Sequence, residues 1–176
     1  MPEKDNRLER DLGKLIDSLD LSERHEQYLR ARWLDQVLWM TRAAGKARQR
    51  YYALRLVTVL GAVIIPGLVS LNLTGNAESA VNWVTFAVSL LVAASASVEA
   101  FFHFGARWRH YRGTVERLKS EGWIYAELSG PYNRPDATHE SAFQDFVGRV
   151  EQALGQETEA YIEGVVAEAG AQRQQT

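Results

Sequence analysis

Two long uncharged segments near the middle of the chain constrain its fold more than any other feature. Residues 56–73 read LVTVLGAVIIPGLVSLNL, and residues 79–98 read SAVNWVTFAVSLLVAASASV. At about 1.5 Å per residue, each is long enough to cross the hydrocarbon core of a bilayer as a helix. Buried helices of soluble proteins seldom run so far without a charge. We therefore predict two transmembrane helices, the second extended beyond Glu99 by the apolar residues 100–104.

The connection between these segments predicts a hairpin. Residues 72–78 contain the turn signal Gly75-Asn76 and are too few for anything except antiparallel neighbours. We expect an all-α membrane protein, a two-transmembrane helical hairpin with long cytoplasmic N- and C-terminal helices. The expected parts are cytoplasmic helices over 1–50, the hairpin over 51–105, further cytoplasmic helices over 106–169 and a disordered tail over 170–176.

Basic residues predict the orientation, because cytoplasmic flanks carry the excess of lysine and arginine. The connection has none, whereas both flanks are rich in them: Arg42, Lys46, Arg48, Arg50 and Arg55 before the first segment, and Arg107, Arg109, Arg112, Arg117 and Lys119 after the second. Both termini are therefore expected in the cytoplasm. Because these clusters flank the spans, they favour membrane lipids over nucleic acid as partners, and we interpret Arg55, Arg107 and Arg109 as lipid or ion-pair contacts.

Apolar residues at helical spacing continue on both sides of the hairpin. They predict a helix over 8–19, a second helix N-capped by Ser22 that runs into the first span, and helices over 106–128 and 138–168 around a loop at 129–135. One hairpin can hardly bury these apolar stripes alone. We expect them to pack on each other and on neighbouring copies as a collar beneath the membrane.

Small residues and one proline mark special points within the spans. Pro66, followed by Gly67, lacks a backbone donor and is expected to kink the first span about halfway across, either as a packing kink or as a gating hinge. Gly61, Gly67 and the small residues 93–97 permit close helix approach. Helix contacts within or between hairpins are therefore expected.

A polar stripe along the second span predicts a conduction path, because residues that line a pore meet water while their neighbours meet lipid. Its members recur at steps of three, four or seven and are Asn82, Thr85, Ser89, Ala96, Glu99 and His103. Glu99 would form an acidic ring around a symmetry axis, or would instead pair with Arg55 at the membrane edge. Asn72 and Glu78 would attract cations at the outer mouth, although Glu78 fits an exposed loop acid equally well.

Enzymatic chemistry finds little support in the sequence. The chain has no cysteine, its four histidines are scattered, and no HExxH, GxSxG, P-loop or GxGxxG pattern occurs. We therefore expect neither an enzyme nor a cofactor or metal site.

A family resemblance rests on aromatic and basic positions spread over most of the chain. The segments are RWLDQ at 32–36, YYALR at 51–55, GAVIIP at 61–66, RWRHYR at 107–112, ERLKSEGW at 116–123 and GPY at 130–132. Together they resemble the SLATT-like superfamily of bacterial two-transmembrane proteins, including its large branch labelled a domain of unknown function. The resemblance implies an oligomeric membrane protein of the bacterial inner membrane that forms pores, and some members are proposed to be effectors of defence systems.

Three functions follow from these observations. The first is a homo-oligomeric, cation-permeable ion channel, passing calcium or monovalent cations, with its gate near Pro66 or at a Glu99 ring. The second is a signal-triggered pore-forming effector of a defence system. The third is a non-conducting membrane scaffold that recruits cytoplasmic partners.

Overall fold

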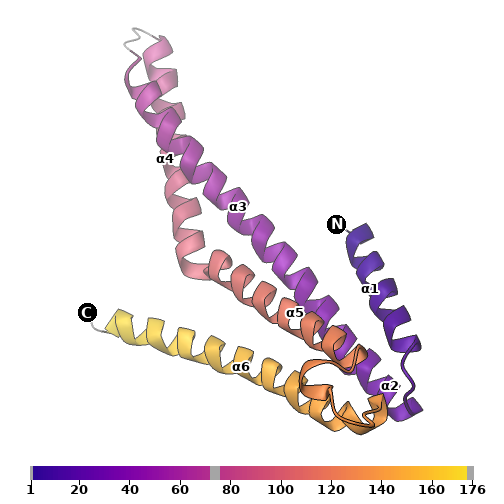
Figure 1. The fold of residues 1–176 in the computed structure, drawn as a ribbon. Coiled ribbons are helices and arrows are strands. Elements are labelled where there is room, and N and C mark those ends of the chain that lie inside the picture. The colour runs from indigo at the N-terminus through magenta and orange to yellow at the C-terminus, as the bar shows by residue number, and fades with distance from the viewer. Residues whose placement is uncertain (1, 72–75, 174–176) are drawn as a thin grey trace. The chain divides into compact units, whose positions relative to one another are not determined.

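The chain is helical throughout the residues that its computed structural model describes, which are 2–71 and 76–173 for the backbone and 3, 6–71 and 77–156 for the side chains. Within these residues no strand occurs, so the predicted all-helical class is confirmed (Figure 1). The elements in chain order are α1 (Pro2–Asp17), α2 (Glu23–Tyr28), the π-helix η1 (Leu29–Leu34), α3 (Asp35–Val69), α4 (Asn76–Phe102), α5 (Phe104–Ala126), the 3₁₀-helix η2 (Gly130–Tyr132) and α6 (His139–Arg173).

The chain divides into two compact units. Met1–Ala43 and His110–Thr176 form one, called the bundle unit below, and Ala44–Arg109 form the other, called the hairpin unit. Both α3 and α5 contribute residues to each unit. The hydrophobic core of large buried side chains lies wholly in the bundle unit.

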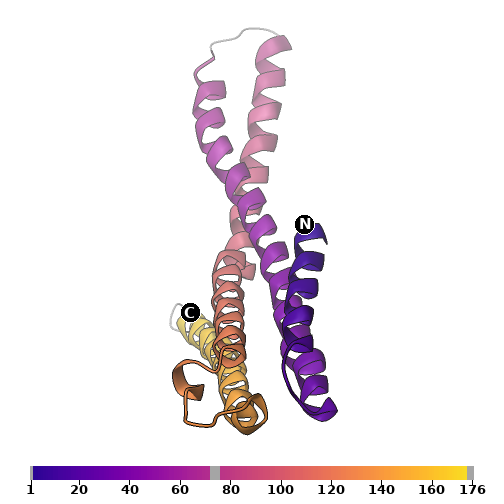
Figure 2. The same cartoon turned by 45° about the vertical axis from the view of Figure 1, so that its right-hand side comes forward.

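The bundle unit buries the apolar stripes of its own helices. Leu12 and Ile16 of α1 join the same core as Leu118 of α5 and Phe146 of α6. Figure 2 shows α1 beside the N-terminal part of the helix that begins at Glu23. The buried leucine and isoleucine of α1 account for this packing. These stripes therefore pack on each other within a single copy, as predicted, and their packing on neighbouring copies stays a prediction.

One helix runs without interruption from Glu23 to Val69, as the sequence predicted. Its π-helical turn at Leu29–Leu34, closed by the Asp35 amide donating to the Arg30 carbonyl, was not predicted. An uninterrupted α-helix would place Arg30 and Glu26 on the face of Leu34, one and two turns before it. The wider π turn holds one extra residue, so Arg30 stays exposed, paired with Asp17 and Glu26, while Leu29 lies in the core.

Trp33 anchors this turn in the centre of the core. Its side chain is 1% exposed, and its indole Nε1 donates to the Leu118 carbonyl at 3.0 Å. The ring lies directly against Gly122 of α5, where any side chain would overlap it. The glycine is thus required by the tryptophan that faces it.

Carboxylates on α6 tie that helix to the start of the long helix. Glu151 accepts from the Tyr28 hydroxyl at 2.8 Å and binds Arg32 in a bidentate pair, whose hydrogen bond holds the pKa of Glu151 below its usual value. The Glu140 carboxylate accepts hydrogen bonds from the backbone amide and the hydroxyl of Ser22. The hydrogen bond from the amide is the main cause of the lowered pKa of Glu140. Ser22 does occupy the predicted N-cap position of α2. Its hydroxyl, however, donates a hydrogen bond to Glu140 of α6 and does not cap the backbone amides of α2.

The segment predicted as a loop at 129–135 carries a core residue. Gly130 adopts φ +56°, and the 3₁₀ turn that follows buries Tyr132 to 1% exposure. Burial raises the pKa of Tyr132, and its hydroxyl donates to Glu121, which also binds Arg149 of α6. The helix predicted from 138 begins at His139, capped by reciprocal bonds between Thr138 and Ser141.

Two helix ends differ from the sequence-based boundaries. α6 continues to Arg173, past the predicted start of a disordered tail at 170, because Ala171, Gln172 and Arg173 are good helix formers. Residues 174–176 lie outside the described part of the chain. α3 ends at Val69, so Pro66 lies in its last turn. The prediction had placed Pro66 about halfway along the first span. A helix tolerates proline poorly and ends within a turn of it.

Candidate functional site

The hairpin unit leaves most of its apolar side chains exposed or only half-buried. The C-terminal part of α3 and all of α4 each contain an 18-residue window of high mean hydropathy, 2.0 and 1.8, of which only 6% is buried. Val63 is 71% exposed, Trp83 69% and Phe101 77%. Core helices of soluble proteins are mostly buried, whereas these two are bare. Both are long and apolar enough to cross a membrane, as the sequence predicted.

α3 and α4 approach closely at Gly61, where any side chain would overlap Val92. Half-buried and buried residues of α4 lie on the same face as Val92: Val81, Thr85, Val88, Ser95 and Glu99. The expected role of Gly61 in close helix packing is therefore confirmed within the hairpin. Gly67 has no atom within 4 Å of the position that a side chain would take, so it has no such role there.

The predicted polar stripe of α4 straddles the edge of this contact face. Thr85, Ser89 and Glu99 are half-buried, and the Thr85 hydroxyl donates to its own helix at the Val81 carbonyl. The three other members, Asn82, Ala96 and His103, are exposed. Because the contact face is centred on Val92 and Ser95, the stripe lies partly on that face and partly beside it, and its role in conduction stays a prediction.

Glu99 and Arg55 do not pair in the described residues, although the hairpin brings them level. Gly61 lies opposite Val92, so antiparallel counting places Leu54 and Arg55 opposite Glu99. Arg55 is nevertheless exposed, whereas Glu99 is half-buried on the α3-facing side. The structure therefore gives no support to the ion-pair interpretation of Glu99.

A single-residue joint separates α4 from α5. His103 has φ +50°, the left-handed region, where its amide still donates to the Glu99 carbonyl and its carbonyl accepts the first bond of α5 from Arg107. Its amide is thus the last donor of α4, and its carbonyl is the first acceptor of α5. Nothing in the sequence marked this break, because histidine is not a helix breaker, although it is enriched several-fold at positive φ.

Three aromatic rings meet beside the joint. Tyr51, Tyr52 and Trp108 lie within 5.4 to 6.4 Å of one another, centroid to centroid. The Tyr51 ring packs on Gly105, where an added side-chain carbon would lie 2.8 Å from it. Arg50 stacks over Phe104 at 5.6 Å. The sequence pattern alone did not reveal the Gly105 notch against which Tyr51 packs.

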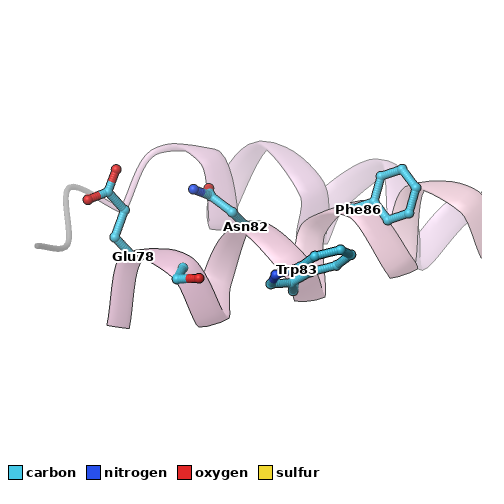
Figure 3. A pocket seen from close by; sticks show the side chains of 5 residues that line it. Glu78, Asn82, Trp83 and Phe86 are labelled. Carbon is cyan, nitrogen blue, oxygen red and sulfur yellow. The ribbon is translucent and has the colours of Figure 1, made fainter. Parts of the chain in front are cut away.

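The far end of α4 carries the predicted outer-mouth acid. Glu78, Ser79, Asn82, Trp83 and Phe86 line an open depression there. Figure 3 shows that Glu78 and Asn82 project from the same side of the helix, one turn apart. Asn72, the other outer-mouth residue, lies outside the described residues.

Comparison with known proteins identifies one family. The model of the family described as a protein of unknown function (DUF4231) matches residues 35–140, well over half of the chain. No curated protein and no solved structure matches. The matched range holds the whole hairpin unit together with Gly122 and Tyr132, which are core residues of the bundle unit. The wider SLATT-like relationship stays a prediction.

Proposed function

The chain belongs to the DUF4231 family of proteins of unknown function, and on that premise we propose that it is a membrane hairpin that assembles into a homo-oligomeric, cation-permeable channel. Calcium and monovalent cations are the candidate ions. Its proposed location is the bacterial inner membrane, with both termini in the cytoplasm. Its partners there are lipids, further copies of itself and the permeating cations.

The bare hairpin is the observation that carries this proposal. Only 6% of the most apolar 18-residue stretch of each of the two helices is buried. Exposed apolar area costs roughly 25 cal/mol per Å² in water, so an uncovered hairpin of this size is unfavourable there. A bilayer covers such a surface without any partner protein. The basic residues at one end and their absence from the connection favour the stated orientation.

The polar edge of α4 supports a conducting assembly. Asn82 is exposed near one end, and Glu99 lies half-buried near the other without Arg55 as a partner. Polar and acidic groups on a lipid-facing surface are costly, so this edge is expected to face other copies or water. Copies arranged about an axis would bring Glu99 residues into an acidic ring, which attracts cations.

Ion flux from liposomes tests the proposal. We expect purified wild-type protein to release a cation but not an anion of similar size, and Glu99→Gln to lower the cation preference several-fold while the oligomer stays intact. Glu127→Gln is the control, since it removes one exposed acid from the bundle unit, away from both spans. It is expected to leave selectivity close to that of the wild type.

Each contrary outcome has a distinct meaning. Flux that appears only after a cellular ligand is added would replace this proposal with the signal-triggered pore. No flux from a well-formed oligomer would favour the non-conducting scaffold. Dissociation of the oligomer by Glu99→Gln, with selectivity unchanged, would remove Glu99 from the conduction path.

A further inference from the structure

The end of the hairpin unit that adjoins the bundle unit in sequence carries a surface that we call the aromatic–basic belt. It consists of the ring triad Tyr51, Tyr52 and Trp108 with the basic residues around it: Lys46, Arg48, Arg50, Arg55, Arg107 and Arg109. All of these residues belong to the one compact unit. Their mutual geometry is therefore set within the hairpin itself.

Charge is strongly asymmetric along this unit. Its six basic residues all lie at 46–55 and 107–109, and its two acids are Glu99 near the same end and Glu78 at the other. Arg55 and Arg109 are exposed, and Glu99 is half-buried on the α3-facing side. The outer surface at this end is thus almost purely cationic, and it complements an anion.

The triad marks the boundary between apolar and basic surface. Tyr52 is 55% exposed, and one helical turn further along α3 the exposed side chains are the apolar Leu56 and Val59. In the opposite direction the nearest charged side chains are the exposed Arg50 and, one turn from Tyr52, the half-buried Arg48. Amphipathic rings at such a boundary favour the headgroup layer of a bilayer. The rings also stay in place, because Tyr51 fills the notch at Gly105.

We propose that the aromatic–basic belt binds the phosphate headgroups of anionic phospholipids in the leaflet nearest the chain termini. The inference rests on the membrane placement proposed above and narrows its lipid partner to one class, the anionic phospholipids, which conduction itself does not require. Arginine donors hold the headgroup phosphate, and the triad covers the glycerol region next to the apolar surface. Nucleic acid or an acidic protein would match the charge but not the bare apolar surface one helical turn away.

Competitive lipid retention tests this inference on the full chain in detergent. The protein is incubated with equal amounts of phosphatidylglycerol and phosphatidylcholine of identical acyl chains, and the bound lipids are counted by native mass spectrometry. We expect wild-type protein to retain phosphatidylglycerol preferentially. Arg55→Gln and Arg109→Gln should each lower the preference about fivefold, given the usual contribution of one basic residue at an anionic surface.

Matched variants separate binding from folding. Arg24→Gln removes the same charge from an exposed position of α2 in the bundle unit and should leave the preference unchanged. Arg55→Lys keeps the charge and should retain most of the preference. An equal loss in Arg24→Gln, or no phosphatidylglycerol preference in the wild type, would overturn the inference.

The remaining outcomes distinguish this inference from the proposed channel. If the wild type shows no lipid preference but binds a single-stranded oligonucleotide through Arg55 and Arg109, the belt is a nucleic-acid surface and the inference is wrong. Lipid preference without ion flux would support lipid binding by the aromatic–basic belt and contradict the proposed channel. Ion flux without lipid preference would support the channel and contradict lipid binding by the belt. Protein that stays in the supernatant without detergent would remove both.

Discussion

Gly122 and Trp33 pack so closely that a side chain at position 122 would overlap the tryptophan ring. The tryptophan is fully buried, its Nε1 is held by the Leu118 carbonyl, and its ring closes over the glycine of α5. Both residues belong to segments that carried the family resemblance. Their contribution is to the fold of the bundle unit, through packing of η1 against α5.

We predict that Gly122→Ala destabilises the protein by about 1–3 kcal/mol, because the new methyl group overpacks a core whose tryptophan cannot withdraw. Thermal unfolding of the full chain in detergent measures the effect. Gly148→Ala is the control: it lies in α6 with no atom within 4 Å of the new carbon, and it should be neutral or stabilising by up to about 1 kcal/mol. Equal stability of the two variants would contradict the packing argument.

Residue patterns indicated which side chains are apolar but not which ones meet. Leu12, Ile16, Phe146 and Val150 were predicted on apolar stripes, and all four lie in the core. That Gly122 faces Trp33, or that Gly61 faces Val92, depends on contacts between distant segments. Helical periodicity is local and carries no information about such pairs.

At the scale of elements, the π turn at Leu29–Leu34 adjusts the phase of the long helix. It is explained by one surplus residue between two apolar patterns that would otherwise be out of register: Tyr28 before it, and Leu34 and Val37 after it. The patterns were visible in the sequence. The surplus was not identified, because each pattern fits a regular helix when taken alone.

We predict that deleting Ala31, an exposed residue inside the π turn, is tolerated. The turn should close into a regular α-helix with both flanking patterns still facing the core, so the variant keeps a cooperative thermal transition and a folded elution volume. Deleting Gln144 from α6 is the control, since it rotates Phe146 and Val150 by about 100° away from the core. Loss of folding in both deletions would mean that the π turn is not a one-residue surplus.

Helix existence was more predictable than helix boundaries. The second predicted span, 79–98, corresponds to α4 at Asn76–Phe102, and its end is set by the left-handed backbone of His103. The predicted halfway kink at Pro66 became a helix end. Both differences concern backbone geometry at single residues, where neighbouring contacts outweigh propensity.

At the scale of the molecule, the two units differ in how much of their apolar surface they bury. The bundle unit covers its stripes with its own helices, whereas the hairpin unit leaves α3 and α4 bare over the windows described above. The sequence indicates that the hairpin surface is apolar, whereas the lipid or neighbouring subunit that buries this surface is not encoded in any local pattern. Subunit number, ion and gate therefore stay with the proposals, and membrane insertion is the claim on which they all depend.

The absence of cysteine from the chain allows a direct test of insertion, because single cysteines can be labelled without background. Ser79→Cys lies at the exposed start of α4 beside the connection, and Ser120→Cys lies on the exposed face of α5 in the bundle unit. With a membrane-impermeant maleimide on intact spheroplasts, we predict that Ser79→Cys is labelled and that Ser120→Cys is labelled only after lysis. Protection of both sites until lysis, or recovery of both variants in the soluble fraction, would contradict a hairpin that crosses the bilayer.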